Sequence, residues 1–129
     1  MKNNKNVILI VEDYAYLREL LKEKLNKEDF EVLEASDGRM GLETALREHP
    51  DIILLDIIMP VMDGISMLDK LRQDEWGKNA IAIILSNLSE AKKINEGIEK
   101  NVFDYLVKSD CNPDEVVTLI KNKLSERKP

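Results

Sequence analysis

The sequence has one cysteine, Cys111, and one histidine, His49. A single cysteine permits no intramolecular disulfide, which is the usage expected in a reducing compartment. A single histidine without an evident partner gives no support for a Ser-His-Asp triad or a histidine-ligated metal site. The chain has neither a G-x-G-x-x-G fingerprint nor a P-loop, so no motif indicates dinucleotide or nucleoside-triphosphate binding.

Long apolar runs and a targeting segment are missing as well. The longest apolar runs, Val7–Val11 and Ile52–Leu55, are far too short to span a bilayer. The N-terminal MKNNKN is polar, and no signal-peptide apolar region follows it. We therefore expect a cytoplasmic protein without membrane insertion. The formal net charge of -6 offers no general attraction to nucleic acid, so we expect no direct nucleic-acid binding.

What is present is the composition of one folded domain. Hydrophobic residues make up 43% and charged residues 34% of the chain, as in globular proteins. No linker, repeat or low-complexity segment interrupts it. We expect a single domain over residues 1–129, with a core between about 7 and 124 and no output domain.

Apolar runs and helical patterns alternate along the chain. Unbroken runs predict buried strands at Val7–Val11, Ile52–Leu55 and Ala80–Leu85, and charge-interrupted runs predict edge strands at Phe30–Ala35 and Phe103–Val107. Apolar residues at helical spacing predict helices over Tyr14–Lys27, Gly38–Glu48, Gly64–Asp74 and Glu90–Lys100, and a last helix with Asn112 as N-cap and Pro113 in its first turn. This alternation predicts a doubly wound α/β fold with an open parallel sheet.

Polar side chains follow four of the predicted strands, at the edge where such sheets bind ligands. They are Glu12 and Asp13 after the first strand, Asp56 after the third, Ser86 after the fourth and Lys108 after the fifth. If the first and third strands are neighbours, the three carboxylates converge. Repulsion between them must then be offset, and a small hard cation such as Mg²⁺, or Mn²⁺, is the natural ligand. A carboxylate beside such a cation, a lysine and a hydroxyl is suited to accept a phosphoryl group.

Each of these residues also has a simpler interpretation. Asp13 could be the N-cap of the first helix, and Ser86 could cap the helix that follows it. Asp56 could be a polar loop residue, and Lys108 could be a solvated side chain. Their joint placement at successive strand ends favours one shared site over four unrelated roles.

Four segments resemble the receiver domain of two-component response regulators. They are VEDYAYLRELL from Val11, LLDIIMPVMDGI from Leu54, IAIILS from Ile81 and DYLVKS from Asp104. The resemblance extends from about residue 7 to 124, and the segment from Leu54 is its most specific part. It implies a flavodoxin-like (βα)5 sheet with strand order 2-1-3-4-5.

The resemblance also implies a site. Asp56 would accept a phosphoryl group from the histidine of a sensor kinase or of a histidine phosphotransfer protein. Asp13, Asp56 and the backbone carbonyl of Ile58 would ligate Mg²⁺, and Glu12 would act through water. Lys108 would contact the phosphoryl oxygens.

The same resemblance implies a switch rather than a turnover enzyme. Ser86 would hydrogen-bond the acyl phosphate, and Tyr105 would be the switch aromatic that moves with it. The resulting change would alter an output face over about residues 90–124, which a separate downstream protein would read. The chain would be a monomer or a phosphorylation-dependent dimer.

The sequence departs from the family pattern in two places. Ser109 follows Lys108 where the family usually has proline, and a cis bond before a non-proline residue would cost about 2.5–4 kcal/mol. Ile58 and Leu88 are apolar at positions that flank the path of a hydrolytic water, which predicts slow loss of the phosphoryl group.

Two rival functions remain. The first is a Mg²⁺-dependent phosphatase or mutase that acts through an aspartyl phosphate, but Ile58 stands where such enzymes place a second acid. The second is a pseudo-receiver that binds partners without phosphorylation, which the complete set of acceptor residues disfavours.

Overall fold

The computed structural model describes residues 5–56, 59–86, 104–107 and 112–126, with the backbone alone for residues 86 and 104–107. One parallel sheet has the strand order β2-β1-β3-β4-β5, as predicted. Its strands are β1 (Val7–Val11), β2 (Glu31–Ala35), β3 (Ile52–Asp56), β4 (Ala82–Ser86) and β5 (Asp104–Val107). The two charge-interrupted runs are the edge strands.

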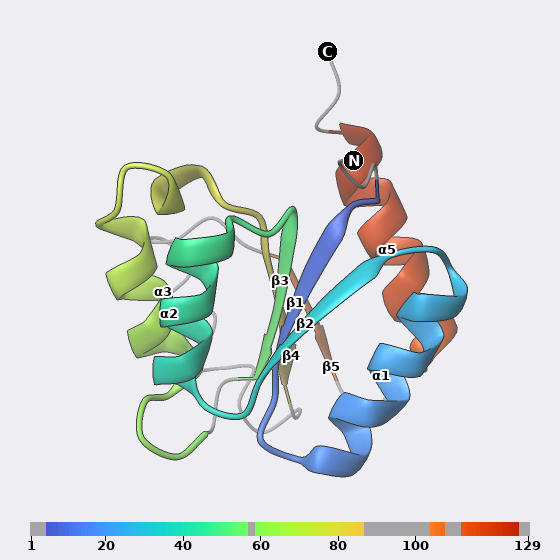
Figure 1. The fold of residues 1–129 in the computed structure, drawn as a ribbon, viewed down its shortest axis with the longest axis horizontal. Coiled ribbons are helices and arrows are strands. Elements are labelled where there is room, and N and C mark those ends of the chain that lie inside the picture. Colours follow the sequence, from blue (N-terminus) through green and yellow to red (C-terminus); the bar gives the residue numbers. More distant parts are fainter. Residues whose placement is uncertain (1–4, 57–58, 87–103, 108–111, 127–129) are drawn as a thin grey trace.

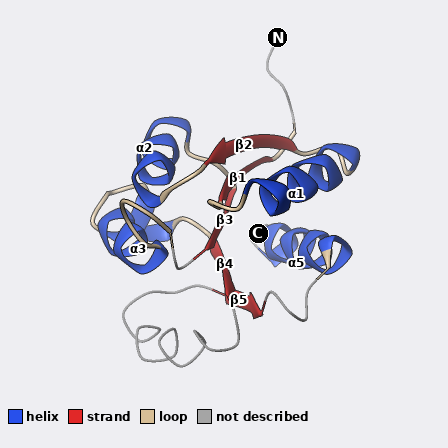
Figure 2. Cartoon of the chain, turned by 90° about the horizontal axis from the view of Figure 1, so that it is seen from below, coloured by secondary structure: helices blue, strands red, loops and turns tan. Residues whose placement is uncertain are grey.

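Helices cover both faces of the sheet (Figure 1, Figure 2). They are α1 (Ala15–Lys27), α2 (Gly38–Glu48), α3 (Gly64–Arg72) and α5 (Pro113–Glu126), with a 3₁₀ turn η1 (Gly77–Asn79). α2 and α3 lie on one face, and α1 and α5 lie on the other. The helix predicted over Glu90–Lys100 falls outside the described residues. None of the described helices is both long and apolar enough to cross a membrane.

The central strands are buried on both faces because helices cover both. Leu9 and Val11 pack into the core beneath α2 and α3, whereas Ile8 and Ile10 pack into the core beneath α1 and α5. This two-sided burial explains why the sequence of β1 is unbroken Val, Ile and Leu instead of alternating apolar and polar residues.

Two strands end one residue later than predicted, and β4 also starts two residues later, at Ala82. Asp56 and Ser86 are the last residues of β3 and β4, not the first residues after them. The sheet ladder explains the difference, because Asp56 lies opposite Leu85 and Ser86 lies opposite Val107. Each of these two strands therefore ends on a polar residue whose backbone is still paired with the neighbouring strand.

Candidate functional site

Three carboxylates converge at the carboxyl edge of the sheet. β1 pairs directly with β3, and Val11 lies opposite Leu55, so the residues that follow each of them are brought to the same level. One carboxylate oxygen each from Glu12, Asp13 and Asp56 lies within 4.8 Å of the others. Glu12 is 1% exposed and Asp56 6% exposed, whereas Asp13 is exposed. The structure therefore brings together the three acids that the sequence placed at these strand ends.

The turn between β1 and α1 is held from several directions. The Glu12 N–H donates to the Ala35 carbonyl at 3.0 Å, and the Tyr14 N–H donates to Glu12 Oε2 at 3.1 Å. The guanidinium of Arg18 donates from Nη1 to the Glu12 carbonyl at 2.7 Å. α1 begins after Tyr14, whose N-cap position has no side-chain capping bond. The interpretation of Asp13 as the N-cap is therefore wrong, and its carboxylate joins the acidic cluster instead.

The backbone around Asp56 is tightly packed. A Cβ atom placed on Gly64 would lie 2.1 Å from the Asp56 carbonyl oxygen, so the start of α3 rests directly against the end of β3. The Asp63 side chain caps α3 by accepting from the Ser66 N–H at 2.8 Å. The Gly38 N–H donates to the Met62 carbonyl at 3.1 Å, which ties the same loop to the start of α2. These contacts hold the start of α3 and the loop before it against the end of β3, where Asp56 lies.

The donor set fits a small hard divalent cation. Carboxylate oxygens are the ligands that Mg²⁺ prefers, and Mg²⁺ is commonly held through one or two of them together with waters. Two buried acids and an exposed one provide such ligands and an open side for water. Like charges at this separation repel one another, and a divalent cation among them would offset that repulsion.

Comparison with known proteins identifies the family. The sequence model of one protein family, the response regulator receiver domain, matches residues 8–121. The chain belongs to this family. The transcriptional regulatory protein SrrA of Staphylococcus aureus is 41% identical over 116 residues, which cover 90% of this chain and 46% of that protein. The chain thus spans about half the length of the curated relatives that it matches.

Solved receiver domains have the same fold. The receiver domain of the Francisella response regulator 1452 has a TM-score of 0.85 and 28% identity, and the match covers 96% of this chain and 100% of that one. The receiver domain of the sensor histidine kinase PA1611 from Pseudomonas aeruginosa has a TM-score of 0.81 and 26% identity, over 92% and 96% of the two chains. That domain is described with a magnesium ion coordinated in its active site cleft. The function of this receiver domain is phosphoacceptor signalling.

Other predicted site residues of the receiver domain are placed only in part. Ser86 ends β4 beside β3, and Tyr105 lies in the edge strand β5 opposite Ile84. Ile58 and Lys108 lie outside the described residues, as do Leu88 and Ser109. The roles assigned to all of these side chains stay predictions.

Sequence reasoning missed Arg18. Its position within an amphipathic helix gave no reason to separate it from other solvated charges. A cation one turn into the helix that follows an acidic pair is the signal that could have indicated it. Its bond to the Glu12 carbonyl became evident only once α1 was placed against the turn.

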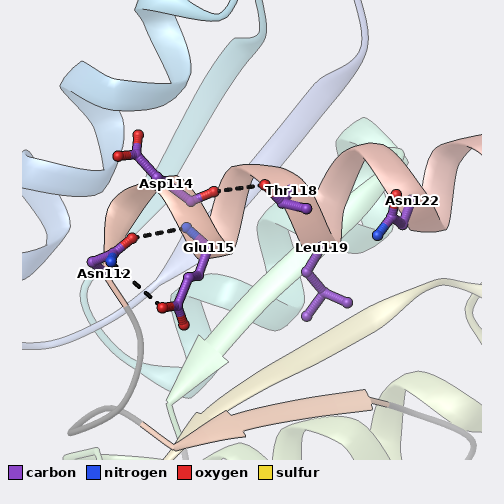
Figure 3. A pocket seen from close by; sticks show the side chains of 6 residues that line it. All are labelled: Asn112, Asp114, Glu115, Thr118, Leu119 and Asn122. Carbon is purple, nitrogen blue, oxygen red and sulfur yellow. Dashed lines mark hydrogen bonds between the residues drawn. The ribbon is translucent and has the colours of Figure 1, made fainter.

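The first turns of α5 present a polar surface (Figure 3). Asn112 caps this helix as predicted, since its Oδ1 accepts from the Glu115 N–H at 2.9 Å. A hollow beside the helix is lined by Asn112, Asp114, Glu115, Thr118, Leu119 and Asn122. These residues fall within the range predicted for the output face.

Proposed function

We propose that the chain is a phosphoacceptor switch in which Asp56 receives the phosphoryl group. The observation that carries this proposal is the convergence of Glu12, Asp13 and Asp56 at the carboxyl edge of a receiver-family sheet. A histidine of a sensor kinase, or of a histidine phosphotransfer protein, is the donor. An Asp56 carboxylate oxygen forms a bond to phosphorus as the bond from phosphorus to the donor imidazole nitrogen breaks. The departing imidazole keeps that electron pair and takes up a proton.

The surrounding residues prepare this transfer. Asp13, Asp56 and the Ile58 carbonyl would hold Mg²⁺, or Mn²⁺, and Glu12 would act through water. When bound, the cation offsets negative charge on the transferring oxygens. Burial of Asp56 removes most of its carboxylate from bulk water, so an opposite charge acts on it more strongly than it would at an exposed site. Lys108 contacts the phosphoryl oxygens.

Phosphorylation then changes the surface that a partner protein binds. Ser86 hydrogen-bonds the acyl phosphate, and Tyr105 moves with it and changes the face over residues 90–124. A separate downstream protein reads that face. We propose that the exchange occurs in the cytoplasm and that the chain binds no nucleic acid itself, since the net charge is -6. Phosphorylation shifts the balance between a monomer and a dimer.

Acetyl phosphate with Mg²⁺ tests the acceptor assignment, with intact mass as the readout. The wild type should gain the mass of one phosphoryl group, in a hydroxylamine-sensitive form. Asp56→Asn should gain none, because an amide is a poor nucleophile and a poor cation ligand. Asp29→Asn is the matched control: its side chain is 83% exposed and its φ of 69° suits asparagine. Labelling of Asp56→Asn at the wild-type level would overturn the assignment.

A turnover phosphatase or mutase is the rival reaction class. We propose that the chain is not such an enzyme, in keeping with the signalling role of the receiver family. Incubation with Mg²⁺ and a simple aryl phosphate ester distinguishes the two classes. Release of many equivalents of phosphate per chain would support the enzyme, whereas at most one equivalent supports the switch.

A further inference from the structure

We infer that Arg18 is a positioning residue for the divalent cation: it holds the turn after β1 in the shape that presents Glu12 and Asp13 to the metal. The inference rests on the proposed function, because it concerns the same acidic cluster. Arg18 lies on α1, and its side chain is 22% exposed.

The contacts of Arg18 connect three elements. Nη1 donates to the Glu12 carbonyl oxygen at 2.7 Å, and Nε lies 3.5 Å from Glu34 Oε1 on β2. A guanidinium can satisfy two acceptors at once, because its donors lie in a rigid plane and point in different directions. One side chain from α1 therefore connects the turn after β1 with the neighbouring strand.

The turn has a particular need for this contact. α1 starts without a side-chain cap at Tyr14, so the backbone that leads from Glu12 into the helix relies on the Tyr14 N–H bond to Glu12 Oε2 and on the Arg18 bond to the Glu12 carbonyl. The cluster must nonetheless hold its carboxylates close together against their mutual repulsion. A charged donor on the Glu12 carbonyl stabilises the turn more strongly than a neutral one. Movement of this carbonyl would carry the carboxylates of Glu12 and Asp13 with it.

A simpler role for Arg18 is a cross-link between α1 and β2. Lys22 separates the two roles because it lies one helical turn further along and binds the same acceptor side chain. Its Nζ lies 3.1 Å from Glu34 Oε2. Removing Lys22 weakens the cross-link and leaves the bond from Arg18 to Glu12 in place. Lys22→Met is therefore the matched control for Arg18→Met.

Two readouts on the full chain test the inference. The first is the Mg²⁺ concentration that gives half the maximal rate of labelling by acetyl phosphate. The second is Mn²⁺ affinity, measured by electron paramagnetic resonance without a phosphodonor. Arg18→Met should weaken both by about threefold to tenfold, and saturating cation should recover most of the labelling rate. Lys22→Met should stay within about twofold of the wild type.

The outcomes are distinguishable. Equal cation affinity in Arg18→Met and the wild type would overturn the inference, and so would an equal loss in Lys22→Met. If Arg18→Met does not fold, Arg18→Lys replaces it. The single side-chain nitrogen of lysine cannot occupy the positions of both Nη1 and Nε, so the inference requires that this variant also binds the cation more weakly than the wild type. If the wild type binds Mn²⁺ but is never labelled, the proposed function fails, while the Mn²⁺ comparison still decides the role of Arg18.

Discussion

Adding one methyl group at Gly64 should disturb both the fold and the acceptor. In Gly64→Ala the new Cβ atom would lie 2.1 Å from the Asp56 carbonyl oxygen and 2.9 Å from Leu55 Cδ1. Ordinary contact begins at about 3.4 Å, so α3 and the end of β3 must separate by about 1 Å. The obstacle is backbone, which cannot rotate away as the end of a flexible side chain can.

The expected loss of stability follows from two opposing terms. Overpacking costs about 1–3 kcal/mol, and a backbone clash belongs at the upper end of that range. Alanine regains up to about 1 kcal/mol over glycine through helix propensity, and less at the first helical residue. We expect Gly64→Ala to lower the free energy of unfolding by about 2 kcal/mol and to move Asp56 relative to the other acids.

Gly77→Ala is the matched control. Its Cβ would meet the Leu71 carbonyl oxygen at the same 2.1 Å, but η1 precedes β4 and so lies at the opposite edge of the sheet from Asp56. Urea unfolding followed by circular dichroism should give similar losses for both variants. Labelling by acetyl phosphate, well below either melting temperature, should be slowed only in Gly64→Ala. Wild-type stability in Gly64→Ala, or equal labelling of the two variants, would refute the reasoning.

Three further predictions test other parts of the molecule. Asp13→Asn should weaken Mg²⁺ binding by about tenfold or more, because even outer-shell changes at metal sites cost that much, and calorimetric titration measures it. The phosphoryl form of the wild type should be long-lived. A double variant Ile58→Asn, Leu88→Glu should lose its phosphoryl group roughly tenfold faster, which is equivalent to about 1.36 kcal/mol in the barrier to hydrolysis. Equal decay rates of the two proteins after removal of the donor would count against the role of these positions in placing the attacking water. The hydrogen bond from Lys121 holds the pKa of the Glu28 carboxyl below its ordinary value of 4.5. A group with a lowered pKa stabilises the fold above its unfolded pKa and loses this contribution as pH falls through the folded value. Thermal melts of wild type and Glu28→Gln should therefore differ slightly at neutral pH and converge as the pH falls below 4.5 and through the lowered folded pKa of Glu28, and an unchanged difference at acid pH would contradict this assignment.

The sequence alone determined the helices and strands of the described residues and the placement of acidic side chains at the strand ends. The bounds predicted for β1 and α2 match the structure, and Asn112 is the N-cap that the pattern indicated. These features depend on local physics: side-chain period, capping side chains and turn-forming residues act within a few positions of the chain. The acids could be placed at strand ends for the same reason.

Only the tertiary structure decided which of those ends meet. Pairing of β1 with β3 brings Asp56 to Glu12, although more than forty residues separate them in sequence. Local pattern left Asp13 open between a helix cap and a site residue, and the packing of the turn placed it in the acidic cluster. His49, which had no evident partner in the sequence, stacks on Trp76 with ring centroids 4.3 Å apart. Such contacts join residues far apart along the chain, and no short-range periodicity encodes them.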